Sequence, residues 1–357
     1  MIGHRSSDFV KIFKEVQEGL KRLFVTSSDV LVMAGSGTLG MESAVSNLLA
    51  PGEPCVVAVG GKFGERWVEI AEAFGARPIV VEYPYGEGLE PSVFEQALKD
   101  HPEARTAFVT QNESSTAVMN DIRGLAAKAR AAGVVLVVDA VSSLGGTPLP
   151  MDEWGVDVVV TGSQKCLMLP PGLAFVAVGE RAWEKAKARA NAKGAYYADW
   201  FRYQKSLRGG ETPYTPAVSL VRGLQESLCM LEEEGAERRF KRHQLMKEMV
   251  RAGLAALGFR LYVSDRWASP TLTAASGGNV DIEAMRKAVK ERTGVVLSGG
   301  QGELKGEIFR IGHMGAATPL DMVATLAAVE LGMEAVGARG VLGRGTTAAM
   351  EVWRSWL

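Results

Sequence analysis

The stretch VVVTGSQKCLMLPPGLAFVAV (158–178) joins two apolar runs through a short polar segment that carries Lys165. Its first run is β-branched, and a Pro-Pro-Gly turn separates the lysine from the second run. This pattern predicts two buried strands connected by a loop. Burial disfavours the ammonium form and lowers the pKa of a lysine, which is the condition for an amine that forms a Schiff base with a carbonyl compound. The alternative is a lysine in a polar loop that reaches solvent.

Strand-like and helix-like segments alternate through the first half of the chain. Residues 8–24 show a helical period of apolar side chains. The strand-like runs are 30–34, 55–59, 78–83, 106–111, 134–139, 157–162 and 173–178, and helix-like segments include 63–74, 91–99 and 121–132. This alternation predicts an α/β fold in which a mainly parallel, seven-stranded sheet is covered on both faces. Ligands bind at the carboxyl ends of the strands in such sheets.

After residue 180 the helices become longer and the strands shorter. Helices are expected at 181–190, 217–232, 236–257, 281–292 and 318–336, and short strands near 259–263, 271–275, 295–298 and 307–312. This pattern predicts a large ligand-binding domain, 1–235, followed by a smaller C-terminal α+β domain, 236–357. The tail, 337–357, is Gly-rich and then amphipathic, so we expect it to add a closing helix.

Bulk composition restricts the classes of partner. The 357 residues carry a formal net charge of −1, which argues against a nucleic acid or an anionic membrane held by bulk electrostatics. The first residues lack the apolar core of a signal peptide, and no later apolar run is as long as a membrane span. We therefore expect a cytoplasmic protein with neither partner. Three unclustered cysteines and four scattered histidines predict neither a disulfide framework nor a metal site.

A glycine-rich loop follows the first strand. The segment AGSGTLGMESAV (34–45) matches G-x-G-x-x-G, as in dinucleotide-binding folds. Those folds also need an acidic residue at the end of the second strand, and here Glu53 precedes that strand. A helix N-terminus with small side chains is a more general phosphate site, and we expect Ser36, Gly37 and Thr38 to form it. A tight turn without a ligand is the alternative.

A carboxylate ends another buried strand. Asp139 is the last residue of VVLVVD (134–139), where an unpaired charge would be costly. Asp139 and Lys165 could pair with each other. Alternatively, both serve one cofactor, with Asp139 on a protonated ring nitrogen and Lys165 on an aldehyde. Pyridoxal 5'-phosphate requires a Schiff-base lysine, an acidic partner for its ring and a phosphate site, and all three are predicted here.

The order of motifs resembles one enzyme family over nearly the whole chain. The motifs are AGSGT, GGKFGE, TQNESSTA, VDAVSSLGG, TGSQKCLMLPPG and FRIGHMG. They resemble the class V, fold-type I pyridoxal-phosphate aminotransferases, and most closely the alanine–glyoxylate and serine–pyruvate group. The resemblance implies that Lys165 binds the cofactor and moves the substrate α-proton, while Asp139 keeps the ring nitrogen protonated.

The same resemblance implies roles for further residues around the cofactor. Phe63 and Val141 would pack on the two faces of the ring, Ser114 would approach the ring hydroxyl, and Gln164 would approach the phosphate. Arg310 would bind the substrate α-carboxylate, since arginine forms planar bidentate pairs with carboxylates. Ordinary turn, core or surface roles are the alternatives for these residues. We expect His313 to be structural.

The segment GGETPYTPAVSL (209–220) resembles the loop that a neighbouring subunit contributes to the phosphate in this family. Thr212, Tyr214 and Thr215 carry suitable hydroxyls, and the sequence does not select among them. The resemblance implies a homodimer whose active sites are shared between subunits.

The resemblance favours a ping-pong aminotransferase that moves the amino group of alanine or serine to glyoxylate or pyruvate. No second basic residue that would hold a side-chain carboxylate is identifiable, but aspartate or phosphoserine specificity stays open. A lyase or a cysteine desulfurase is a further alternative, although Gln164 stands where desulfurases normally have histidine. A non-catalytic subunit is disfavoured, because Lys165, Asp139 and Arg310 are all present.

Overall fold

The computed structural model describes residues 2–189, 196–277 and 279–357. Seven strands form one large sheet in the order β1-β9-β8-β7-β4-β2-β3. They are β1 (Asp29–Gly35), β2 (Pro54–Val59), β3 (Arg77–Glu82), β4 (Thr106–Thr110), β7 (Val135–Asp139), β8 (Val158–Gly162) and β9 (Gly172–Val178). Only β9 runs antiparallel to its neighbours in this sheet. All seven predicted strands lie in this mainly parallel sheet, which confirms the α/β fold.

Helices cover both faces of the large sheet, because its strands are apolar on both sides. Val30 and Val32 of β1 face one core and Leu31 and Met33 face the other. The first core takes side chains from α1 (Ser7–Phe24), α4 (Pro91–Asp100), α5 (Ile122–Ala131) and α9 (Val218–Glu234), with the single turn α6 (Met151–Trp154) beside it. The second takes them from α2 (Gly37–Leu48), α3 (Lys62–Ala73), α7 (Glu180–Arg189) and α8 (Trp200–Leu207).

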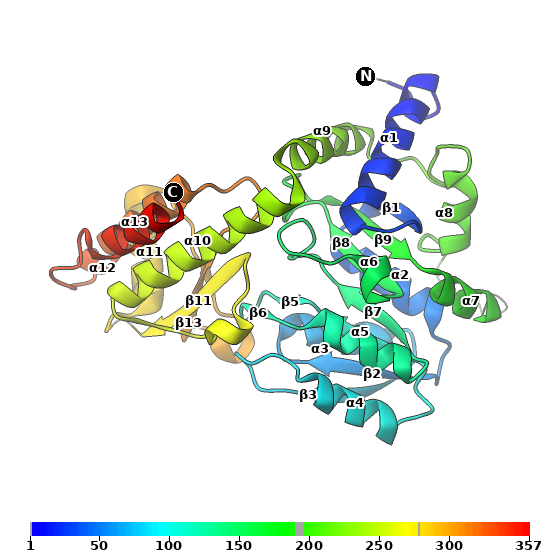
Figure 1. The fold of residues 1–357 in the computed structure, drawn as a ribbon, viewed down its shortest axis with the longest axis horizontal. Coiled ribbons are helices and arrows are strands. Elements are labelled where there is room, and N and C mark those ends of the chain that lie inside the picture. Colours follow the sequence, from blue (N-terminus) through cyan, green and yellow to red (C-terminus); the bar gives the residue numbers. More distant parts are fainter. Residues whose placement is uncertain (1, 190–195, 278) are drawn as a thin grey trace.

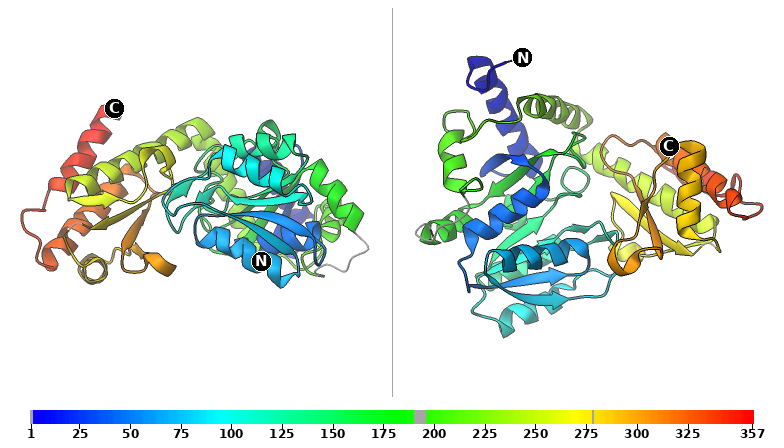
Figure 2. Two further views of the ribbon diagram at one scale, coloured as in Figure 1. Left: turned by 90° about the horizontal axis from the view of Figure 1, so that it is seen from below. Right: turned by 180° about the vertical axis from the view of Figure 1, so that it is seen from behind.

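The C-terminal part of the chain builds a second, antiparallel sheet with its own core (Figure 1). Its strands, in the order β10-β11-β13-β12, are β10 (Phe259–Leu261), β11 (Leu272–Gly277), β12 (Ser298–Gly299) and β13 (Ile308–Gly312). The helices are α10 (Ala236–Ala256), α11 (Ile282–Thr293), α12 (Pro319–Ala335) and α13 (Arg344–Trp356), with short 3-10 turns at Asp265–Trp267 and Gly302–Leu304. Figure 2 shows these residues, yellow to red, on one side of the large sheet.

The junction between the two parts lies between α9 and α10. Gly235 separates the two helices with a positive φ of 76°, a conformation that glycine adopts at low cost. Helix α10 then leads away from the large sheet and along the small one (Figure 1). We retain a domain boundary after residue 235 as a proposal, which this break in the helical path supports.

Short elements account for most differences from the sequence-based expectation. Helix α8 and the hairpin of β5 (Asn112–Glu113) and β6 (Val118–Met119) were not predicted, because they are too short for a periodic signal. The strand expected at 295–298 is only Ser298–Gly299, since only these residues pair with β13. The helix expected at 181–190 ends at Arg189, and residue 190 lies outside the described residues. Helix α13 confirms the closing helix. None of the helices in the described ranges is both long and apolar enough to cross a membrane.

Candidate active site

One cavity of about 260 Å³ lies at the carboxyl ends of β7 and β8. We call it the Lys165 cavity. Its lining residues are Ser36, Gly37, Thr38, Met41, Phe63, Arg66, Asn112, Ser114, Asp139, Val141, Ser142, Gln164 and Lys165. The fold therefore brings together the predicted phosphate residues, both predicted ring-facing residues, and the lysine and aspartate.

Lys165 lies in the loop between β8 and β9, which hydrogen bonds hold closed. The backbone of Ser163 pairs with that of Leu173 at 3.0 Å, and the Ser163 hydroxyl donates to the carbonyl of Pro170 at 2.8 Å. From outside the loop, Ser227 of α9 donates to the carbonyl of Leu167 at 2.5 Å. Burial, with the nearby Arg310 guanidinium, lowers the pKa of the Lys165 amine. A lowered pKa favours the neutral amine, which is the nucleophilic and basic form.

Asp139 is the last residue of β7 and is buried. Its carboxylate accepts the N–H of Val141 at 2.8 Å and makes no ion pair with Lys165. Burial is the main cause that raises the pKa of Asp139, and the nearby charge of Glu113 adds to it. The hydrogen bond from Val141 and the charges of Arg66 and Lys165 lower it, and the resulting pKa is about 7. Lys165 therefore does not neutralise the buried Asp139 carboxylate by direct pairing. The carboxylate is available to a cationic group of a ligand.

The N-terminus of α2 lies on the same cavity and has room for an anion. Ser36, the N-cap residue, makes no side-chain capping bond. Among the described residues, the N–H of Leu39 donates to the Ser36 carbonyl at 2.9 Å, whereas the N–H groups of Gly37 and Thr38 have no partner. A Cβ atom at Gly37 would lie 2.6 Å from a methyl carbon of Val141, so only glycine allows this close approach. Free N–H groups at a helix N-terminus bind phosphate.

Two buried amide oxygens at the cavity lack partners. Gln164 Oε1 and Asn112 Oδ1 have no hydrogen-bond partner among the described residues. Buried polar groups are normally hydrogen-bonded, so an unpaired amide oxygen that lines a cavity is available to a hydrogen-bond donor of a ligand. Together with Lys165, Asp139 and the α2 N-terminus, these groups fit a cofactor that carries an aldehyde, a ring nitrogen and a phosphate.

Phe63 and Arg66 lie one helical turn apart near the start of α3 and both line the cavity. The guanidinium carbon of Arg66 lies 4.8 Å from the centre of the Phe63 ring. Arg66 makes no ion pair and no hydrogen bond with any residue that the structure describes. It is a second basic residue at the site, which sequence reasoning did not identify.

Arg310 lies beside the cavity rather than in its lining. It is the third residue of β13. Its guanidinium donates to the carbonyl of Gly299 at 2.7 and 3.0 Å and to the carbonyl of Ser114, a cavity residue, at 2.5 Å. The arginine is thus held at the edge of the cavity, between the two sheets.

The predicted phosphate hydroxyls of 212–215 do not line the Lys165 cavity of their own chain. Thr212 donates to the carbonyl of Tyr214 at 2.7 Å, and Tyr214 donates to the carbonyl of Tyr196 at 2.7 Å. Thr215 is exposed. Within one chain, these three hydroxyls and the N-terminus of α2 therefore do not line the same cavity.

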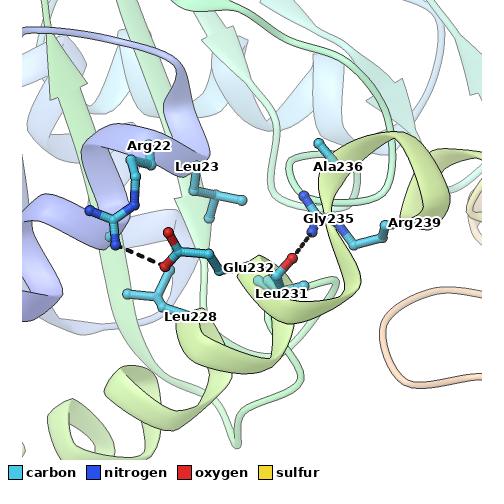
Figure 3. A pocket seen from close by; sticks show the side chains of 9 residues that line it. Arg22, Leu23, Leu228, Leu231, Glu232, Gly235, Ala236 and Arg239 are labelled. Carbon is cyan, nitrogen blue, oxygen red and sulfur yellow. Dashed lines mark hydrogen bonds and ion pairs between the residues drawn. The ribbon is translucent and has the colours of Figure 1, made fainter.

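A different cavity, of about 190 Å³, lies where α1, α9 and the start of α10 meet (Figure 3). Its charged side chains are already engaged. Arg22 pairs with Glu232 at 2.9 Å, and Arg239 donates to the carbonyl of Leu231 at 2.6 Å. Without a lysine or an uncompensated carboxylate, this cavity lacks the chemistry of the Lys165 cavity.

Four lining residues escaped the sequence reasoning: Met41, Arg66, Asn112 and Ser142. Arg66 had a usable signal, because residues three apart share a helix face and Phe63 was already predicted there. Asn112 and Ser142 bond to each other at 2.9 Å, a contact between β5 and the turn after β7 that no local pattern reveals. His313 is buried and bonded to Thr273 at 2.9 Å, which fits the structural role expected for it.

Known proteins are similar to this chain in sequence and fold. The profile of the family Aminotransferase class-V matches residues 1–316. A protein of Synechococcus sp. (strain PCC 6716) named soluble hydrogenase, small subunit, is 41% identical over 98% of this chain and 92% of its own. The serine–glyoxylate aminotransferase of Methylorubrum extorquens is 35% identical over 98% of this chain and 90% of its own. The crystal structure of pyridoxamine–pyruvate aminotransferase from Mesorhizobium loti superposes with a TM-score of 0.94 at 33% identity, covering 100% of this chain and 92% of that chain.

The fold and the Lys165 cavity, with these relatives, define a pyridoxal-phosphate-dependent enzyme of fold type I. Within that class, the chain belongs to the class V aminotransferases. It is a transaminase, and the relatives agree with the alanine/serine–glyoxylate group that its motifs resemble.

Proposed function

We propose that this transaminase moves the amino group of a small L-amino acid, alanine or serine, to glyoxylate or pyruvate in a ping-pong cycle. The observation that carries the proposal is the presence of Lys165 and Asp139 in one cavity, beside the free N-terminus of α2. When bound, pyridoxal phosphate supplies an aldehyde that condenses with amines and a ring that accepts the electron pair of the α-carbon.

The side chains of the cavity would divide the work as follows. Lys165 would hold the cofactor covalently at rest, and its amine would then take the α-proton and return it at the aldehyde-derived carbon of the cofactor. The Asp139 carboxylate would form an ion pair with the protonated ring nitrogen, which would compensate the buried charge. Arg310 orients the substrate through its α-carboxylate, and the N–H groups of Gly37 and Thr38 hold the phosphate. Phe63 and Val141 would exclude water from the ring faces.

A homodimer is part of this proposal. The hydroxyls of Thr212, Tyr214 and Thr215 lie away from their own chain's cavity, which supports their action on the phosphate of a neighbouring subunit. A second copy of the chain would then complete each active site.

A panel of single amino acids tests the proposed reaction. Without an acceptor, alanine or serine should yield about one equivalent of 2-oxo acid per active site, and turnover should begin only when glyoxylate or pyruvate is added. Continuous product release without an acceptor would instead identify a lyase. Release of sulfur from cysteine would identify a desulfurase, although burial raises the pKa of Cys55 and Cys166 to about 12, which disfavours thiolate chemistry at both.

One observation favours keeping aspartate as a second candidate donor. Arg66 is a cation at the cavity without an ionic partner among the described residues, and it could pair with a side-chain carboxylate. If it does, Arg66→Met should lower kcat/KM for aspartate and leave that for alanine unchanged. Equal losses for both donors would remove aspartate from consideration.

The name of the cyanobacterial relative suggests a different activity, hydrogen chemistry, which no observation on this chain favours. No group of three or more His, Cys, Asp or Glu side chains that could hold a metal ion occurs in the part of the chain that the structure describes.

A further inference from the structure

We propose that Glu113 is a positioning residue that fixes Phe63 and Arg310 relative to each other. The proposal rests on the roles proposed above for these two residues. Glu113 lies in β5, in the segment 113–115 that connects helix α3 with the smaller sheet; Figure 1 shows β5 and β6 between them. The residue itself does not line the Lys165 cavity.

Glu113 is fully buried, and both of its carboxylate oxygens are hydrogen-bonded. Oε2 accepts the backbone N–H of Phe63 at 3.0 Å and of Gly64 at 3.1 Å. Oε1 accepts the backbone N–H of Ser115 at 3.1 Å and its hydroxyl at 2.5 Å. All four partners are donors, and no ion pair with Glu113 occurs within the described ranges. Four donors therefore require a side chain that accepts hydrogen bonds at both of its terminal positions, as a carboxylate does.

These bonds hold the first turn of α3. Besides the two N–H groups bound by Glu113, the N–H of Lys62 donates to the Ser115 hydroxyl at 3.0 Å. Three successive N–H groups of the helix N-terminus are therefore held by residues 113 and 115. A negative charge at this end of a helix is favourable. The approach is close, since a Cβ atom at Gly61 would lie 2.5 Å from the Glu113 carboxyl carbon.

The residue between these two anchors reaches the other sheet. The carbonyl of Ser114 accepts the Nη1 group of Arg310 at 2.5 Å, while Nε and Nη2 of the arginine bind the carbonyl of Gly299. Segment 113–115 is thus bonded to the start of α3 on one side and to β13 on the other. A shift of the segment away from α3 that keeps its bond to Arg310 would therefore move the Phe63 ring relative to the Arg310 guanidinium.

An amide cannot replace this carboxylate. In Glu113→Gln, one of the two positions carries an NH₂ group, which would face either the N–H groups of α3 or the N–H of Ser115. A donor facing a buried donor leaves both unpaired. The segment must then shift away from α3 or from its own turn, although the side chain keeps its size.

Glu330 offers a matched control. It is also buried, and its carboxylate accepts the N–H groups of Gly343 at 2.7 Å and Thr346 at 2.8 Å at the start of α13. Glu330→Gln therefore makes the same chemical change at a helix N-terminus, and neither Glu330 nor its partners line the Lys165 cavity. The Glu330→Gln variant therefore measures how much stability is lost with such a carboxylate when the Lys165 cavity is unaffected.

The test compares Glu113→Gln with Glu330→Gln in three measurements: circular dichroism of the bound cofactor, amide hydrogen exchange of the cofactor-free protein, and kcat and KM for the amino donor. Glu113→Gln should weaken the cofactor signal, speed exchange at Phe63 and Gly64, and raise KM by about tenfold, which corresponds to about 1.4 kcal/mol. Glu330→Gln should change none of these three readouts, although it should lower the melting temperature about as much as Glu113→Gln does. Equal effects in both variants, or an unchanged cofactor signal and KM in Glu113→Gln, would overturn the proposal.

Two further comparisons keep the outcome decisive. If Glu113→Gln does not fold, Ser115→Ala removes only the hydroxyl that links Glu113 to Lys62 and should shift the same readouts in the same direction. Unchanged values in Ser115→Ala would then count against the proposal. If no amino acid reacts with the wild-type enzyme, the proposed substrate class fails, while the dichroism and exchange measurements still decide the role of Glu113.

Discussion

Lys165 and Asp139 line the same cavity without pairing with each other. Their surroundings shift both groups towards neutrality, since burial lowers the pKa of the lysine and raises that of the aspartate. A bound ring would separate them, with its aldehyde at the amine and its cationic nitrogen at the carboxylate. Opposite shifts in neighbouring titratable groups are typical of acid–base sites.

Asp139→Asn should leave cofactor binding measurable but slow removal of the α-proton by about 100-fold or more, because a neutral amide cannot keep the ring nitrogen charged. Stopped-flow measurement of the half-reaction with a single amino acid gives this rate. Asp157→Asn is the control, since Asp157 is also buried and accepts the N–H of Leu136 at 2.8 Å, outside the cavity lining. Equal rates for wild type and Asp139→Asn would remove this carboxylate from the mechanism.

The buried carboxyl of Asp139 should also make stability depend on pH. Its pKa rises from an ordinary value of 3.8 to about 7 in the folded chain. The folded chain then binds the proton more tightly than the unfolded one, so the stabilisation is complete below 3.8 and disappears as the pH rises through about 7. Between these values, cofactor-free wild type should lose melting temperature relative to Asp139→Asn. If the melting temperatures of wild type and Asp139→Asn changed in parallel with pH over this range, Asp139 would not titrate as described.

Arg310→Lys should raise KM for the amino donor by about tenfold to 100-fold, because a lysine cannot keep the bonds to Gly299 and Ser114 while offering a planar pair to a carboxylate. Steady-state kinetics with saturating acceptor measure this change. Arg251→Lys provides the comparison, since Arg251 is a buried arginine of the same part of the chain that pairs with Asp265 at 2.6 Å. A KM change of the same size in both variants would argue for a structural role of Arg310.

Mixing two inactive variants tests the shared site. Lys165→Ala lacks the reacting amine, and the double variant Thr212→Ala/Thr215→Ala lacks the hydroxyls proposed to serve the neighbour. If subunits complete each other's sites, a refolded mixture should regain activity, because hybrid dimers contain one site with both parts intact. No recovery despite hybrid dimers in native mass spectrometry would assign the 212–215 segment to its own chain.

The sequence predicted most of this architecture for identifiable physical reasons. Strands buried on both faces appear as continuous apolar runs, so all seven strands of the large sheet were found. Lys165 and Asp139 were identified because a charge at the end of such a run needs a partner. Helix α8 and the β5–β6 hairpin were missed, since their short segments depend on packing rather than on a periodic pattern.

The parts of the site that escaped prediction depend on contacts between distant segments. Glu113 stands in TQNESSTA as an ordinary acidic residue, and only the fold shows that its donors come from α3, 50 residues earlier for Phe63. Likewise, Arg310 reaches Ser114 across 196 residues of sequence. Local propensity carries no information about such pairs.

The most direct test of the role of Lys165 is to reduce the cofactor-loaded enzyme with borohydride and locate the modified residue by peptide mass spectrometry. We expect a stable pyridoxyl adduct on Lys165, in about one copy per chain, and a Lys165→Ala enzyme that releases all cofactor on denaturation. An adduct on another lysine, or no adduct in an active enzyme, would contradict it.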